Sequence, residues 1–152
     1  MTETLFYHLE RRALEDVLPK LVEKSLERGW RALIRCESAE RAEAIDTLLW
    51  TYDEESFLPH AAHGDGEAER QPVLITVEPG NANAAQALFL VGAAAPLDWT
   101  GYDDFVRVVL IFDGRDAGAE ETALRSLEKA RSFGHEVKYY RQTPGGKFQL
   151  QG

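Results

Sequence analysis

Two histidines, His60 and His63, are spaced as H-x-x-H, and Asp65 and Cys36 could complete a set of metal ligands. Zinc sites, however, usually combine two paired ligand motifs. This chain has one such pair, in a stretch rich in acidic residues. The pattern therefore favours exposed histidines beside an acidic loop, and we expect neither a metal nor another cofactor.

The candidate nucleophiles lack the local sequences that would activate them. Ser56 is not part of a G-x-S-x-G element, which exposes a nucleophilic serine on a sharp turn. Cys36 ends an apolar run and is typical of a small core residue rather than a reactive thiolate. The carboxylates at 53–55 are consecutive, too crowded to divide into a general acid and a general base. We expect no catalytic residues and no enzyme activity.

Phosphate-binding loops are also missing. A dinucleotide fingerprint, G-x-G-x-x-G, would stand between the first strand and the first helix, where this chain has His8 to Arg12. No G-x-x-x-x-G-K-[ST] occurs, and the glycines at 64–66 and 145–146 are short pairs. A Rossmann-type nucleotide-binding module or enzyme remains the alternative function, because the alternation of strands and helices permits it.

Large apolar residues gather around an irregular stretch that spans about residues 53–72. Trp50, Phe57, Leu58 and Pro59 lie at a helix end and in this loop. Loops usually run over the surface, and aromatic residues are enriched at the centres of interfaces. These residues either cover the core or form a protein-binding patch. The sequence pattern does not distinguish between these two roles.

The net charge of −9 argues against direct nucleic-acid binding, which depends on clustered basic residues. The charge is unevenly distributed, since the segment from Arg125 to Gly152 holds six basic and two acidic residues. A solvated helix face explains this excess most simply, and a docking surface for an acidic partner is the alternative.

Aromatic and basic residues alternate near the C-terminus, where Tyr139, Tyr140, Arg141 and Lys147 could form a platform for single-stranded DNA. Packing along an edge strand is the favoured explanation for these tyrosines. We therefore expect little or no direct nucleic-acid binding.

Apolar runs predict seven strands to position these residues. Residues 106–112 form the clearest run, and 87–91 also permits a helix because of its leucines. The predicted strands are 5–8, 31–36, 73–77, 87–91, 106–112, 136–141 and 147–150.

Spacings of three and four residues predict three helices. The first begins after Asp16 as N-cap, with Pro19 in its first turn, and ends at Gly29. The second is capped by Ser38 and the third by Asp116, with Gly134 after its end. The expected buried residues are Ala42, Ile45, Leu48, Leu49 and Tyr52 in the second helix, and Ala123, Leu124, Leu127 and Ala130 in the third.

This order predicts a single three-layer α/β/α domain over residues 1–152. Its sheet should be mostly parallel, with an antiparallel hairpin at one edge. The chain has no basic and apolar leader, no membrane-length apolar run and one cysteine, so we expect a cytoplasmic protein.

A distinctive string of residues connects the second helix with the third predicted strand. Leu49-Trp50 is followed by E-S-F-L-P-H at 55–60, by Gly-Asp-Gly at 64–66 and by P-V-L-I at 72–75. Together with Phe6-Tyr7, Gly29-Trp30-Arg31 and Phe112-Asp113-Gly114, this string resembles the bacterial DNA polymerase III chi subunit family over essentially the whole chain.

The resemblance implies a Rossmann-like fold without a nucleotide site. It also implies a non-catalytic accessory subunit of the clamp-loader assembly, acting in DNA replication. The psi subunit would be the first partner, bound through the psi-side residues, which are Trp50, Phe57, Leu58, Pro59 and His60.

The second implied partner is the acidic, phenylalanine-ended C-terminal tail of single-stranded DNA-binding protein. Basic residues of the last helix would bind it, here Arg125, Lys129 and Arg131. The chain also departs from the family pattern in this helix. Leu127 replaces an aromatic residue, Glu128 a basic residue and Leu124 an arginine.

Overall fold

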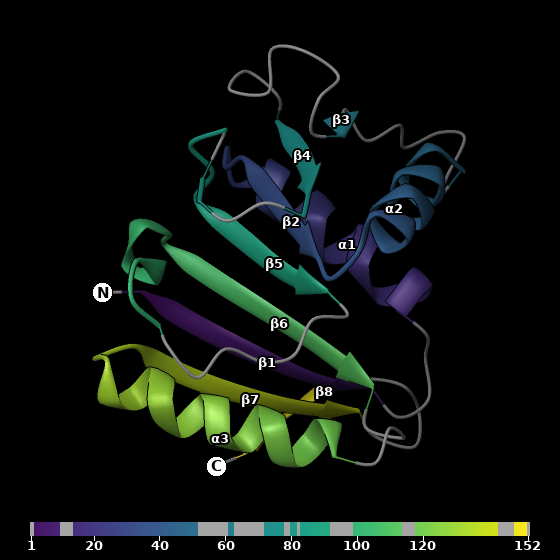
Figure 1. Ribbon diagram of the computed structural model, residues 1–152. Coiled ribbons are helices and arrows are strands. Elements are labelled where there is room, and N and C mark those ends of the chain that lie inside the picture. Colours follow the sequence, from purple (N-terminus) through teal and green to yellow (C-terminus); the bar gives the residue numbers. More distant parts are fainter. Residues whose placement is uncertain are drawn as a thin grey trace.

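The computed structural model describes residues 2–9, 14–51, 61–62, 72–77, 80–81, 83–91, 99–113, 118–142 and 148–151. Within them, eight strands form one sheet in the order β3-β4-β2-β5-β6-β1-β7-β8, with helices on both faces (Figure 1). The strands are β1 (Glu3–Leu9), β2 (Ala32–Cys36), β3 (Ala61–Ala62), β4 (Val73–Thr76), β5 (Ala87–Val91), β6 (Arg107–Asp113), β7 (Glu136–Gln142) and β8 (Phe148–Gln151). The helices are α1 (Leu14–Glu27), α2 (Ala39–Thr51), the 3-10 helix η2 (Tyr102–Asp104) and α3 (Ala119–Ser132).

The sheet is parallel throughout except at its last strand. The β1 strand pairs in parallel with both β6 and β7, and β2 pairs in parallel with β4 and β5. The β8 strand then runs antiparallel to β7, with Tyr140 opposite Leu150. This arrangement confirms the predicted α/β fold and its antiparallel edge hairpin.

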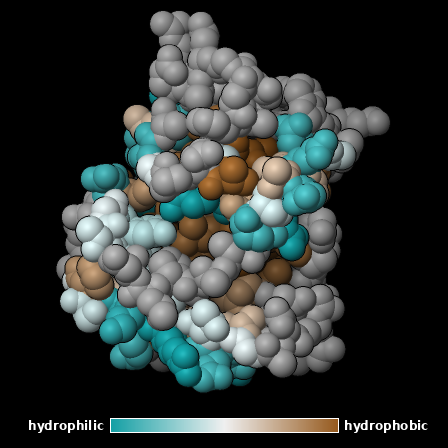
Figure 2. Space-filling model, in the orientation of Figure 1, coloured by the Kyte–Doolittle hydropathy of each residue, from teal (hydrophilic) through white to brown (hydrophobic). Residues whose placement is uncertain are grey.

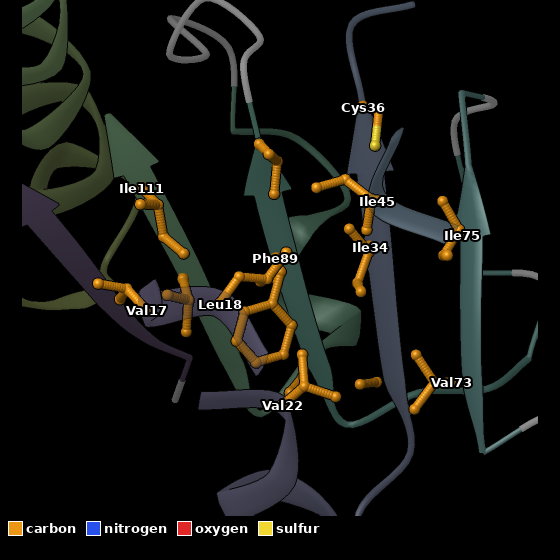
Figure 3. Packing of buried hydrophobic residues seen from close by; sticks show 14 of the residues in the cluster. Val17, Leu18, Val22, Ile34, Cys36, Ile45, Val73, Ile75, Phe89 and Ile111 are labelled. Carbon is orange, nitrogen blue, oxygen red and sulfur yellow. The ribbon is translucent and has the colours of Figure 1, made fainter. Parts of the chain in front are cut away.

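One face of the sheet is covered by α1 and α2. Val17, Leu18 and Val22 of α1 and Ile45 of α2 pack into one buried cluster with strand residues such as Phe89 (Figure 3). The helices supply apolar residues at spacings of three and four, and the strands supply every second residue. Burial of this cluster fixes both helices on the same side of the sheet.

The opposite face is covered by α3 and the segment before β6. Ala123, Leu127 and Ala130 of α3 join a second buried cluster, which includes Trp99 and Phe6. Because neighbouring residues of β1 point to opposite faces, Leu5 belongs to the first cluster and Phe6 to the second. Both faces of the central strands are therefore buried, which explains their nearly continuous apolar sequences.

Helix α1 begins earlier than predicted. Its first residue is Leu14, so Asp16 is not its N-cap and Pro19 lies inside the helix rather than in the first turn. Proline at this position removes the hydrogen bond to the carbonyl of Glu15, one turn earlier. Val17, Leu18 and Pro19 are all buried, and tertiary packing outweighs the local preference. The stop at Gly29 is confirmed by its φ of +81°.

Helix α2 begins as predicted. The side-chain oxygen of Ser38 accepts a 3.1 Å hydrogen bond from the backbone N–H of Arg41. Ile45 and Leu49 are buried, with Ala42 and Leu48 packed against the same cluster. Tyr52 lies outside the described residues.

The structure differs from two predictions for helix α3, its N-cap and one of its buried residues. Its N-cap is Gly118, at a φ of 92° and without a side-chain cap, whereas the predicted cap Asp116 lies outside the described residues. Leu124 is 45% exposed, while Ser126 is fully buried. The end at Gly134 is confirmed by a φ of +90°.

The remaining strand predictions agree with the structure, with one addition. Residues 87–91 form a strand, which decides against the helix alternative. The stretch predicted to be irregular contains the two-residue strand β3, which pairs with Leu74 and Ile75 of β4. Within the described residues, no helix is both long and apolar enough to cross a membrane.

Candidate functional site

The outer side of α3 carries the basic residues for which the sequence predicts an acidic partner. Figure 2 shows this side as a mostly hydrophilic band along the lower edge of the molecule. The helix is anchored from beneath, because the indole Nε1 of the buried Trp99 donates a 3.1 Å hydrogen bond to the carbonyl of Ser126. The exposed side chains are therefore presented by a helix that is held in place over the sheet.

Arg125, Lys129 and Phe133 follow one another at intervals of four residues. Residues with this spacing lie along one side of a helix, and Phe133 occupies the C-cap position directly after the last turn. All three residues are exposed, Phe133 by 47%. We call these three residues the α3 row. It places two cations and an aromatic ring in line on the surface.

The two cations of the row differ in their present partners. Arg125 forms an exposed ion pair with Glu121 at 2.6 Å. Exposed pairs at this spacing contribute only about 0.3–0.5 kcal/mol, so a competing carboxylate can displace Glu121 at little cost. Within the described residues, Lys129 forms no ion pair.

Arg131 does not extend this row. It lies two residues beyond Lys129, about 200° further around the helix axis. Its guanidinium pairs with Glu128 at 3.3 Å. The three basic residues predicted to form one site are therefore divided between two sides of α3, and only Arg125 and Lys129 are neighbours.

The α3 row has the chemistry to bind a carboxylate that adjoins an apolar group. Lysine and arginine form charge-assisted hydrogen bonds with carboxylates, and an exposed ring offers contact area to a second ring. The sequence prediction missed Phe133, because it treated the residues before Gly134 as a helix end. The signal that could have identified it is the spacing of four from Lys129.

The psi-side residues fall mostly outside the described part of the chain. Trp50 belongs to α2, and Phe57, Leu58, Pro59 and His60 lie outside the described residues. The choice between core cover and protein-binding patch thus stays a prediction for these residues.

At the carboxyl ends of two adjacent strands, side chains contact one another on the α3 face of the sheet. The helix after β1 covers one face and the helix after β6 covers the other, so these adjacent strands form a topological switch point. At their carboxyl ends, His8 Nδ1 lies 2.6 Å from the hydroxyl of Tyr139, and the ring of Phe112 is 5.0 Å from the imidazole. Arg141 lies beside His8 and pairs with Glu120 at 2.7 Å.

The predicted core role of Cys36 is confirmed. The residue is buried, and burial raises the pKa of its thiol to about 12. Within the described residues, no three His, Cys, Asp or Glu side chains are grouped to hold a metal ion. His60, His63 and Asp65 lie outside the described residues.

The aromatic and basic residues near the C-terminus do not form one surface. Tyr139 packs with the α3 side of the sheet and Tyr140 with the α1 side. The hydroxyl of Tyr139 also forms a hydrogen bond with His8, and the guanidinium of Arg141 donates one to Glu120. Lys147 lies outside the described residues. The alternation of side chains along β7 separates the groups that the sequence places together, which favours the packing explanation for these tyrosines.

Comparison with known proteins gives a family match over most of the chain. Residues 1–138 match the family described as DNA polymerase III chi subunit, HolC. The chain is 28% identical over 91 residues to the probable DNA polymerase III subunit chi of Rickettsia prowazekii (strain Madrid E), covering 60% of this chain and 55% of that protein. It is 35% identical over 63 residues to the DNA polymerase III subunit chi of Escherichia coli (strain K12), covering 41% of this chain and 43% of that protein. The chain thus spans about half the length of these curated relatives.

Proposed function

This chain belongs to the DNA polymerase III chi subunit family, and from that premise we propose that it is a non-catalytic accessory subunit that links the clamp loader to single-stranded DNA-binding protein during DNA replication. In this proposal a psi subunit connects the chain to the clamp loader, and the C-terminal tail of single-stranded DNA-binding protein is the second partner. The observation that carries the proposal is the α3 row of Arg125, Lys129 and Phe133.

The row suits an acidic tail that ends in phenylalanine. Lys129 and Arg125 would pair with the terminal carboxylate and the acidic side chains, and the ring of Phe133 would contact the terminal phenyl group. The Glu121 carboxylate, 2.6 Å from Arg125, already shows the kind of contact that a tail carboxylate would replace. Arg131 would act only at longer range, through the positive charge of the helix end.

The proposed psi contact uses the psi-side residues. Substituting Trp50 or Phe57 by Ala should reduce co-elution with psi while leaving binding of the tail peptide unchanged. Loss of both activities in one variant would instead indicate a folding defect, which a thermal melt would detect.

The non-catalytic part of the proposal is supported by the sequence that follows β1, where the chain has His8 to Arg12 instead of a glycine-rich phosphate-binding loop. We therefore expect millimolar NAD, ATP or GTP to leave the thermal midpoint unchanged, because a specific ligand would raise it.

A peptide titration tests the tail contact directly. A fluorescein-labelled peptide with the acidic, phenylalanine-ended sequence should bind with a measurable anisotropy change, and a scrambled peptide of the same charge should bind more weakly. Lys129→Ala, Arg125→Ala and Phe133→Ala should each weaken binding by about 3- to 30-fold, which corresponds to one charge-assisted contact or ring contact.

Arg131→Ala serves as the matched control, since it removes the same charge from the other side of α3. It should weaken binding less than Arg125→Ala. Equal binding of the ordered and scrambled peptides would refute recognition of the tail. A larger effect at Arg131 than at Arg125 and Lys129 would move the contact to the other side of the helix.

A further inference from the structure

One arginine lies within the apolar face that the sheet turns toward α3. Arg35 is the second-last residue of β2 and shares its face with Leu33, which packs in the same buried cluster as Trp99. Its neighbours in register are Thr76 of β4 and Leu90 of β5, and both are buried. Since charged residues seldom stand among buried neighbours without a partner, the position of Arg35 indicates a specific role.

The surrounding strands form a second topological switch point, besides the one between β1 and β6. After β2 the chain enters α2, which packs on the α1 face, whereas the segment after β5 packs Trp99 and Phe105 on the α3 face. Open α/β sheets bind ligands outside the carboxyl ends of their strands at such points. Arg35 is therefore located where this fold class favours a ligand.

The guanidinium of Arg35 is held by neutral groups. Its Nη1 donates a hydrogen bond to the hydroxyl of Tyr102 at 3.3 Å, and its Nη2 donates one to the carbonyl of Gly80 at 2.9 Å. The guanidinium carbon also lies 5.7 Å from the centroid of the Tyr102 ring, which packs against Trp99. Among the described residues, no carboxylate forms an ion pair with Arg35. The side chain is fixed in place without a counter-charge.

The Nε of Arg35 is buried and has no acceptor among the described residues. An arginine side chain cannot shed its charge by deprotonation, and a buried charged donor without an acceptor is costly. The Nε and Nη2 groups lie on the same side of the guanidinium, and Nη2 carries a second N–H besides the one bound to Gly80. Together they form the fork that binds an oxyanion through two parallel hydrogen bonds.

We propose that Arg35 and Tyr102 bind a small tetrahedral oxyanion of the phosphate type at the carboxyl end of β2. The Nε and Nη2 of Arg35 donate to two of its oxygens. The hydroxyl of Tyr102 accepts from Arg35 and donates its own proton to a third oxygen. Three donors match a tetrahedral anion, which has four oxygens, better than a carboxylate, which has two. The anion supplies the counter-charge that the guanidinium lacks.

The expected ligand is inorganic phosphate rather than a nucleotide. The residues after β2 are Glu37 and Ser38, whereas a nucleotide site requires glycines here for close approach of the backbone. The hydroxyl of Ser38 already caps α2, and the carboxylate of Glu37 pairs with Arg41 at 3.1 Å. The site therefore depends on two side chains, which agrees with the unchanged thermal midpoint expected with NAD, ATP or GTP.

A nuclear magnetic resonance titration of the full chain tests this site. The probe is the Nε–H cross-peak of Arg35 in a proton–nitrogen correlation spectrum, identified by its loss in Arg35→Lys. Inorganic phosphate, added at constant ionic strength with chloride, should shift this cross-peak to saturation. One arginine fork corresponds to weak binding, with a dissociation constant of roughly 1–10 mM. If Arg35→Lys does not fold, through-bond correlation along the Arg35 side chain identifies the same cross-peak in the parent chain.

Arg28 is the matched control within the same spectrum. Its guanidinium also lies over an aromatic ring, 5.2 Å from the centroid of Trp30, but its side chain is exposed. The Arg28 Nε–H should move little and without saturation, and Arg28→Lys should leave phosphate binding unchanged. Tyr102→Phe keeps the ring and removes one donor, so it should weaken binding by about 3- to 10-fold. Acetate should bind at least about 5-fold more weakly than phosphate, because it has two oxygens.

Each arm of the titration can overturn the proposal. An Arg35 cross-peak that shows no saturable shift up to about 50 mM phosphate would leave this residue as a structural tie between Gly80 and Tyr102. Acetate binding as tight as that of phosphate would reject a tetrahedral anion. Unchanged affinity in Tyr102→Phe, with a thermal melt like that of the parent chain, would remove the hydroxyl from the site.

Discussion

Trp99 and Ser126 are joined by a hydrogen bond of 3.1 Å from the indole Nε1 to the backbone carbonyl. Trp99 is buried, and its ring also contacts Phe6 of β1 and His135, which precedes β7. One side chain thus connects α3, β1 and the turn before β7. The exposed row on α3 depends on this buried contact for its position.

Trp99→Ala should lower the free energy of unfolding by about 3–5 kcal/mol, because it empties a large buried volume. Trp99→Phe keeps part of the ring but removes the donor, and should cost less, about 1–2 kcal/mol. Urea denaturation followed by circular dichroism measures both. If Trp99→Phe unfolded at the same urea concentration as the parent chain, neither the hydrogen bond nor the lost ring volume would contribute net stability.

The ion pairs of Glu3 lead us to expect that the protein loses stability in acid. Its carboxylate contacts Arg107 at 2.7 Å and Lys138 at 3.1 Å. Burial alone would raise the pKa of Glu3, but Lys138 and Arg107 outweigh burial and lower it from the ordinary value of 4.5. The folded state therefore binds this proton less readily than the unfolded state. The stabilisation is complete above about pH 4.5 and is lost as the pH falls through the lowered pKa.

Glu3→Gln should consequently reduce stability at neutral pH and flatten the decline of stability between about pH 5 and pH 3. Glu136→Gln is the matched control, because Glu136 stands opposite Glu3 in register and forms no ion pair within the described residues. Urea midpoints measured at several pH values give the comparison. Equal acid profiles for Glu3→Gln and the parent chain would contradict the assignment.

Cys36 should be chemically silent in the folded protein. Burial raises the pKa of its thiol to about 12, so only roughly one molecule in ten thousand carries a thiolate at pH 8. A disulfide reagent such as DTNB should release no colour from the native chain and one equivalent after unfolding in urea. Rapid reaction of the native chain would show that the thiol is accessible.

Ser38→Ala should destabilise the protein by about 1 kcal/mol, because it leaves an N–H of the first turn of α2 without its cap. Ser38→Asp preserves an acceptor at the same position and should restore most of this loss. Ser132→Ala is a useful contrast, since that exposed hydroxyl bonds to the carbonyl of Lys129 at the end of α3. A thermal melt of the three variants should rank Ser38→Ala lowest.

Binding of the acidic tail peptide should weaken as salt rises, because exposed charge pairs are screened over about 8–10 Å at ionic strengths of 0.1–0.15 M. The salt dependence should be smaller for Lys129→Ala than for the parent chain, since one cation no longer takes part. Phe133→Ala should keep the parent slope at lower affinity. Equal slopes for Lys129→Ala and the parent chain would exclude Lys129 from the contact.

Local patterns predicted the secondary structure well where packing and propensity agree. Ser38 caps α2, and glycines at 29 and 134 stop α1 and α3 at positive φ, as expected. Residues 87–91 could be predicted as a strand or as a helix, because leucines are common in helices, and the structure shows a strand. Its pairing with both β2 and β6 decides for a strand, and pairing partners are not visible in a local window.

The predictions failed where tertiary contacts outweigh local preference. Leu124 was expected on the buried side of α3 and is exposed, whereas Ser126 is fully buried and its carbonyl accepts a hydrogen bond from Trp99. Hydropathy alone predicts that Leu124 is buried and Ser126 exposed. The buried side of α3 instead follows from its tertiary packing, which places Ala123, Leu127 and Ala130 in one cluster with Trp99.

By itself, the sequence determined the alternation of strands and helices, the mostly parallel sheet with its antiparallel hairpin, and the family. These properties depend on short-range periodicity and on motif strings, both of which are written along the chain. Only the tertiary structure decided which charged and aromatic side chains share a surface. It joined Arg125, Lys129 and Phe133 in one row, separated Arg131 from them, and set Tyr139 and Tyr140 on opposite faces. The physical reason is geometric, since the turn of a helix and the alternation of a strand assign neighbouring residues to different sides.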